Sequence, residues 1–177
     1  DDFVEGDITK SNGTLSNFSQ TSSTVYTVTF TPTADGSATI DVADSTFTDA
    51  AGNNNTAADQ FNWTYDGTGP TMTITASEGS DPFTSNDATL SLTFTSTEAT
   101  TDFVKADDIT VTNGILGSLS DTSTTVYTAT FTPAADGAAT IDVADSAFTD
   151  AYGNNNTAAA QFNWTYDNTG PTMIGII

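Results

Sequence analysis

The chain has no cysteine and no histidine, and its only basic side chains are Lys10 and Lys105. Without cysteine it forms neither disulfides nor thiolate metal sites. Without histidine as well, Ser-His and Cys-His catalysis are excluded. Against the two lysines stand 23 acidic residues, which give a formal net charge of −21. Nucleic-acid binding is therefore excluded, because phosphate recognition requires clustered lysine and arginine. An anionic surface of this kind favours a cationic partner, and a divalent metal ion is the simplest one.

Long apolar runs are also missing. No run approaches the roughly 18 residues that a membrane-spanning helix requires, so the sequence predicts no membrane insertion. Serine and threonine together occupy 54 of the 177 positions. This excess is typical of solvated β-surfaces and of extracellular proteins.

What the chain does contain is an internal repeat. Residues 7–72 recur at 108–173 with a constant offset of 101, and 51 of the 66 aligned positions are identical. Units of this size suit independent domains better than the short units of a solenoid. A chain that copies such a unit gains length or multivalency, whereas an enzyme needs one shaped pocket.

The repeated unit has the pattern of an all-β fold, because apolar residues alternate with polar ones at a period of two. Turn residues such as Asn113-Gly114 and Asp136-Gly137 separate these runs. Six or seven short strands at this spacing predict an antiparallel β-sandwich. The expected inward-facing sets are Leu90, Leu92 and Phe94; Tyr127, Ala129 and Phe131; Ala139, Ile141 and Val143; and Phe162, Trp164 and Tyr166.

Pro70 and Pro171 follow the ends of equivalent predicted strands and stiffen the connection there. They place the domain boundary in a linker at 67–70. Residues 71–167 are then a complete domain, and residues 1–66 are a partial repeat that lacks its first two strands. Residues 168–177 are expected to form a second linker and the first strand of a following repeat.

Three segments carry a family resemblance: DITVTNG, VYTATFTPAADGAATIDVADSAFTDAYGNNNTAA and the linker TYD-x-TGPT. Together they resemble the tandem bacterial Ig-like domains of giant extracellular adhesins and of cell-surface stalk or appendage proteins. The resemblance implies tandem Ig-like antiparallel β-sandwich domains in an extended extracellular stalk. It implies neither a catalytic activity nor a binding target.

Acidic residues cluster where an Ig-like strand order brings loops and the linker together. Calcium takes six to eight oxygen ligands, so three or four of these acids suffice for a site. In related adhesin repeats, ions at such junctions stiffen the array, and the resemblance suggests the same here. The candidate calcium ligands are Asp49, Asp66, Glu98, Asp102, Asp107 and Asp150. In the alternative interpretation, Asp150 and Asp49 only form Asx-turns with their own loops.

Six asparagines satisfy the N-x-S/T pattern for N-glycosylation. This number is only a small excess over chance for a chain so rich in serine and threonine. The candidate glycosylation sites are Asn12, Asn17, Asn54, Asn62, Asn155 and Asn163.

The sequence thus favours a non-enzymatic stalk or spacer repeat of an extracellular surface protein, with neighbouring Ig-like repeats as its partners. The alternative is a subunit of a self-assembling filament or hair-like appendage, in which strands of a neighbouring chain complete the partial repeat. A carboxylate glycosidase is a remote third alternative, because a pair of acids is enough for that chemistry.

Overall fold

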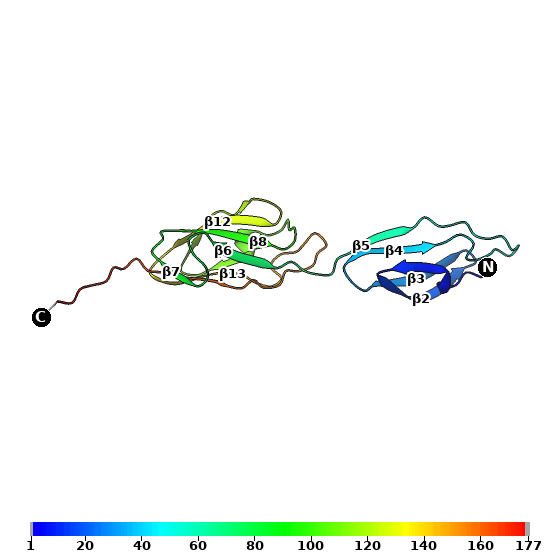
Figure 1. Cartoon of the computed structure of the whole chain (residues 1–177), viewed down its shortest axis with the longest axis horizontal. Coiled ribbons are helices and arrows are strands. Elements are labelled where there is room, and N and C mark those ends of the chain that lie inside the picture. The colour runs from blue at the N-terminus through cyan, green and yellow to red at the C-terminus, as the bar shows by residue number, and fades with distance from the viewer. Residues whose placement is uncertain (1, 176–177) are drawn as a thin grey trace. The chain divides into compact units, whose positions relative to one another are not determined.

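The computed structural model describes residues 2–175. The chain forms two compact units, Asp1–Thr68 (unit 1) and Gly69–Ile177 (unit 2). Both are built from β-strands, as the alternation predicted (Figure 1). The helices in the described residues are a single 3-10 turn, η1 (Glu5–Asp7), and the short α1 (Lys105–Asp108). Neither has the length or apolar character to cross a membrane.

Unit 2 contains two sheets that face each other across one core. One sheet has the order β10-β12-β8-β6, with β11 also paired to β12, and the other has the order β7-β14-β13-β9. All pairs are antiparallel except β14 with β7, which is parallel. The strands are β6 (Met72–Ala76), β7 (Phe83–Ser85), β8 (Leu90–Ser96), β9 (Ile109–Val111), β10 (Gly114–Leu116), β11 (Ser120–Asp121), β12 (Val126–Pro133), β13 (Gly137–Val143) and β14 (Phe162–Tyr166).

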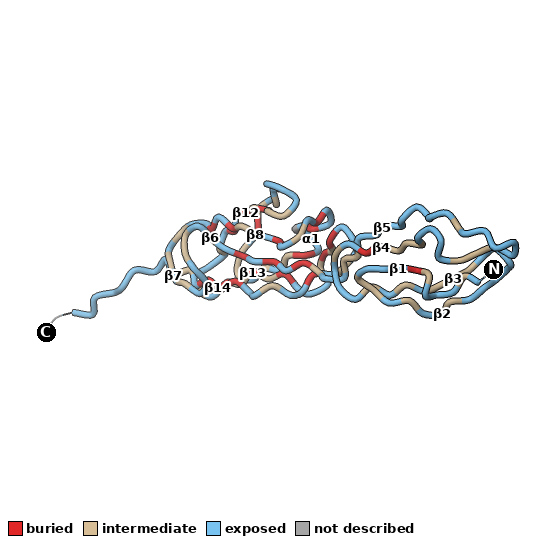
Figure 2. The backbone as a smooth tube through the Cα atoms, turned by 45° about the vertical axis from the view of Figure 1, so that its right-hand side comes forward, coloured by how far each residue is buried: buried red, intermediate tan, exposed pale blue. Residues whose placement is uncertain are grey.

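The core of unit 2 consists of the residues that the period-two pattern placed on the inward faces. In β8, β12, β13 and β14, buried residues alternate with more exposed ones. Phe103 and Phe148 add two rings from outside the strands. Of the predicted inward-facing residues, Tyr166 alone is half-buried, and the others are buried. Most of the buried stretches, drawn in red, lie in unit 2 (Figure 2).

Unit 1 contains the equivalents of the last six strands of unit 2. One of its sheets has the order β1-β4-β5 and the other pairs β2 with β3. Its single long strand β2 corresponds to β10 and β11 together. The strands are β1 (Ile8–Ser11), β2 (Gly13–Ser22), β3 (Val25–Pro32), β4 (Gly36–Val42) and β5 (Phe61–Tyr65).

Equivalent aromatic residues are buried in unit 2 and exposed in unit 1. Trp164 is 1% exposed and Phe162 is 2% exposed, whereas Trp63 is 41% exposed and Phe61 is 60% exposed. The local sequence is the same, FNWTY, in both places. The difference comes from the neighbouring strands, because unit 2 has β6, β7 and β8 and the described part of unit 1 has no equivalent of these three.

Three features escaped the sequence analysis. The strand β7 was not predicted, since three residues are too few to show a period. The repeat also extends toward the N-terminus, where Asp2-Phe3-Val4 corresponds to Asp102-Phe103-Val104 at an offset of 100, one residue being inserted before Asp108. In the C-terminal tail, residues 168–175 form no strand. The last two residues of the predicted strand, 176 and 177, lie outside the described residues.

Candidate functional site

The loop that follows β13 is built around the carboxylate of Asp150. One oxygen, Oδ1, accepts hydrogen bonds from the backbone N–H groups of Tyr152 (2.8 Å) and Asn154 (2.9 Å). The other, Oδ2, accepts one from Asn154 Nδ2 at 2.8 Å. Burial raises the pKa of Asp150, but these hydrogen bonds outweigh it and the net pKa lies below the ordinary value.

Asp49 forms the same loop in unit 1. It accepts hydrogen bonds from the N–H groups of Ala51 and Asn53, both at 2.9 Å, and from Asn53 Nδ2, also at 2.9 Å. The hydrogen bonds from Asn53 are the main cause of its lowered pKa. Both residues therefore make the hydrogen bonds of an Asx-turn, and any metal at Asp150 would share a carboxylate that already supports its loop.

Asp102 holds a distant loop segment in place. Its two oxygens accept hydrogen bonds from the N–H of Thr149 (3.1 Å each), and Oδ2 also accepts the Thr149 hydroxyl at 2.8 Å. Burial raises its pKa, and the bonds from Thr100 and Thr149 lower it to a net value below the ordinary one. In unit 1, Asp2 accepts the N–H of Thr48 at 2.6 Å in the same way.

Asp107 is exposed in α1, and its neighbour Asp108 has the structural role. Asp108 is 6% exposed and accepts the N–H of Val104 at 2.6 Å. Burial is the main cause of its raised pKa. Asp7 accepts the N–H of Val4 at 2.8 Å in unit 1. Asp108 was not among the residues predicted from the sequence; the Asp-Phe-Val segment that precedes it in both repeats is the signal that could have identified it.

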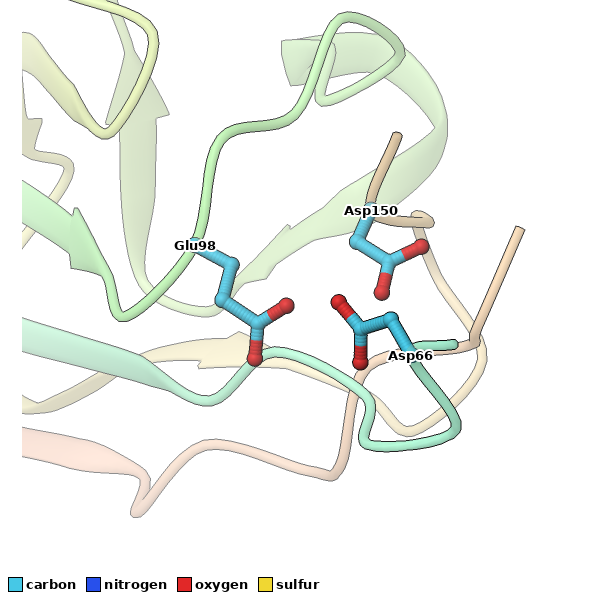
Figure 3. Close-up of side chains that lie close together, drawn as sticks. All are labelled: Asp66, Glu98 and Asp150. Atoms are coloured by element: carbon cyan, nitrogen blue, oxygen red, sulfur yellow. The ribbon is translucent and has the colours of Figure 1, made fainter. Parts of the chain in front are cut away.

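Three of the six candidate calcium ligands come together. Carboxylate oxygens of Asp66, Glu98 and Asp150 all lie within 4.8 Å of one another, and the three side chains point toward a common centre (Figure 3). Asp66 and Glu98 are half-buried and Asp150 is buried. Asp49, Asp102 and Asp107 do not belong to this acidic group.

The donor set of the acidic group fits a hard cation. It offers only oxygens, which calcium prefers, and three negative charges. The whole chain has only two lysines to neutralise 23 acids. Three carboxylates do not fill a coordination sphere of six to eight oxygens, so carbonyl groups and water would have to provide the rest. The acidic group therefore has the chemistry to bind a metal ion.

The candidate glycosylation sites differ in accessibility. Asn17, Asn54, Asn62 and Asn155 are exposed, whereas Asn12 and Asn163 are half-buried. Asn12 donates from Nδ2 to the carbonyl of Ala34 at 2.7 Å, and Asn163 donates to that of Gln161 at 2.9 Å. The four exposed asparagines remain the better candidates for modification.

Comparison with known proteins finds one family in both repeats. Residues 1–65 and residues 66–166 each match the model described as bacterial Ig-like domain. A comparison with curated proteins finds no match. Among solved structures, the chain is similar to Yersinia pseudotuberculosis InvD, with 23% identity and a TM-score of 0.40. This similarity covers 94% of the present chain and 49% of the InvD chain, so the chain spans about half the length of that structure.

Proposed function

The chain belongs to the bacterial Ig-like domain family, and we propose from this membership that it is a non-enzymatic stalk or spacer segment of an extracellular, cell-surface protein. Its immediate partners would be neighbouring Ig-like repeats. Domains of this family usually occur in surface-exposed proteins, and the high serine and threonine content agrees with that location.

The near-identity of the two repeats carries the proposal. With 51 of 66 positions the same, the repeats carry nearly the same side chains twice and no unique set of reactive groups. Two of the strongest acidic candidates, Asp150 and Asp49, accept hydrogen bonds from their own loops in both copies. Repetition of this kind supplies length, which is what a spacer needs.

We further propose that calcium stiffens the segment through the acidic group of Asp66, Glu98 and Asp150. Without a cation, three carboxylates within 4.8 Å repel one another. A bound divalent ion would replace this repulsion with shared coordination and would stabilise the folded state by mass action.

Single-molecule force spectroscopy on the whole chain, held at its two ends, tests both parts of the proposal. Unit 2 should unfold in one cooperative step that lengthens the chain by about 300 Å, as expected for a domain of this size. Calcium should raise the unfolding force above that in chelator at equal ionic strength, because screening by sodium alone also relieves repulsion. Gradual extension without a distinct step would contradict the stalk proposal.

The double variant Asp66→Asn/Glu98→Gln should lose the calcium response while it keeps the unfolding step. A matched control, Asp44→Asn/Asp145→Asn, removes the same charge from two exposed positions outside the acidic group. An equal calcium response in both double variants would show that the ion binds elsewhere or acts only by screening.

A further inference from the structure

Unit 1 has an uncovered apolar face that the fold of unit 2 explains. It contains a hollow of about 390 Å³. The lining residues are Phe3, Ser23, Thr24, Tyr26, Val42, Phe47, Asn55, Thr56 and Ala58. Each of these nine residues has an equivalent in unit 2 through the repeat, so unit 2 shows what covers the same face.

In unit 2, backbone groups at three of the equivalent positions are paired. The carbonyl of Thr124 accepts the N–H of Thr100 at 3.0 Å, and that of Thr125 accepts the N–H of Ser96 at 2.8 Å. The N–H of Thr157 donates to the carbonyl of Pro70 at 3.0 Å. The covering segments are therefore Pro70, just before β6, and the residues from Ser96, at the end of β8, to Thr100. The corresponding positions in unit 1 are Ser23, Thr24 and Thr56, which line the hollow.

The edges of two strands are open in unit 1 as well. In unit 2, β12 pairs with β8 over the register from Val126↔Thr95 to Phe131↔Leu90, and β14 pairs with β7. Within residues 2–68, β3 pairs with β2 and β5 pairs with β4, each on one side only. An open strand edge beside exposed aromatic side chains is a template for an added strand.

We propose that unit 1 is an acceptor for a strand-forming peptide segment of the kind that residues 70–100 supply to unit 2. The occupant is a polypeptide segment with the alternating pattern Leu90-x-Leu92-x-Phe94, which adds a strand along β3. The repeat fixes its register. The position equivalent to Leu90 lies opposite Phe30, that of Leu92 opposite Val28, and that of Phe94 opposite Tyr26.

In unit 1, where the segment is absent, the ring of Phe18 makes the contact that Phe94 of β8 makes in unit 2. Phe103 contacts the rings of Phe94, Tyr127 and Phe148, with centroids 5.8, 5.0 and 5.1 Å away. The equivalent Phe3 contacts Tyr26, Phe47 and, instead of a ring from β8, Phe18 of β2 at 5.6 Å. Leucine stands at the equivalent position in unit 2, Leu119. The proposal therefore includes a movement of Phe18 away from Phe3 when the segment binds.

The test uses the whole chain and a labelled synthetic peptide with the sequence of residues 70–100. Binding should raise the fluorescence anisotropy of the peptide and shift the tryptophan emission of the chain to shorter wavelength. Trp164 is already buried and Trp63 is 41% exposed, so the shift reports on unit 1. A control peptide with serine in place of Leu90, Leu92 and Phe94 should give neither signal.

A gain-of-function variant keeps the test independent of folding defects. Phe18→Leu copies unit 2 and clears the place of the incoming ring, so it should tighten peptide binding about fivefold or more. Ile115→Ser changes a side chain of unit 2 that is 72% exposed and should leave binding unchanged.

Three results would overturn the proposal. The first is an unchanged anisotropy and emission with the native peptide, and the second is equal binding of the serine peptide. The third is a concentration-dependent dimer of the chain that excludes the peptide, because the occupant of the face would then be a second copy.

Discussion

Replacing Trp164 by alanine is expected to destabilise unit 2 by about 3–5 kcal/mol. The indole is 1% exposed, and its ring lies 5.5 Å from Tyr166, 6.1 Å from Phe131 and 6.2 Å from Phe83. Its Nε1 donates a hydrogen bond to the hydroxyl of Ser85 at 3.0 Å. Truncation leaves a large cavity between the sheets and removes the hydrogen bond from the indole to Ser85 of β7.

The same substitution at the equivalent position of unit 1 is the control. Trp63 is 41% exposed, and among the described residues its ring lies near those of Phe30 and Tyr65 only, so Trp63→Ala should cost roughly half as much or less. Denaturant unfolding of the two variants and the parent chain, followed by circular dichroism, measures both losses. Equal losses at the two positions would contradict the difference in burial.

Asn156→Ala should cost about 3 kcal/mol or more, because it removes four backbone hydrogen bonds that are buried or partly buried. Asn156 is 2% exposed. Its Oδ1 accepts the N–H groups of Ala147 (2.7 Å) and Phe148 (2.9 Å). Its Nδ2 donates to the carbonyls of Ala144 (2.8 Å) and Thr157 (2.9 Å). One side chain thus closes the loop between β13 and β14.

The adjacent Asn155 is exposed and provides the matched control. Asn155→Ala removes the same amide group one residue away and should change the stability of unit 2 by less than about 0.5 kcal/mol. The free energy of unfolding of the two variants measures the difference. Similar values for both would show that the four hydrogen bonds of Asn156 do not determine loop stability.

The strands of the core were predictable because each has one face toward the core and one toward water. In β8 and β12 this arrangement produces a period of two that a single sequence displays. The strand β7 shows no such pattern, because it has three residues and joins the sheet through a parallel pairing with β14. The different burial of Trp63 and Trp164 was also beyond the sequence, since the two lie in identical local segments and differ only in their distant neighbours.

The roles of the acidic residues were also only partly predictable from the sequence. The sequence identified the loops that carry acids, but the hydrogen bonds of a carboxylate depend on groups far along the chain. Asp102 pairs with Thr149, 47 residues away, and so supports the loop of Asp150 instead of joining the acidic group. Asp66, Glu98 and Asp150 come from three separate segments, and only the folded chain places their oxygens within 4.8 Å.

The central claim is that the covering strands, and not the local sequence, cause the different burial and pairing of equivalent strands in the two repeats. Amide hydrogen exchange along β3 and β12 tests this claim most directly. The two segments, VYTVTFTP and VYTATFTP, differ at one position, so their intrinsic exchange rates are nearly equal. In unit 2, β12 is paired on both sides, whereas β3 in unit 1 is paired on one side. We expect the amides of β12 to exchange at least about tenfold more slowly, which corresponds to about 1.4 kcal/mol of opening free energy. Equal protection of the two strands in the isolated chain would contradict the account.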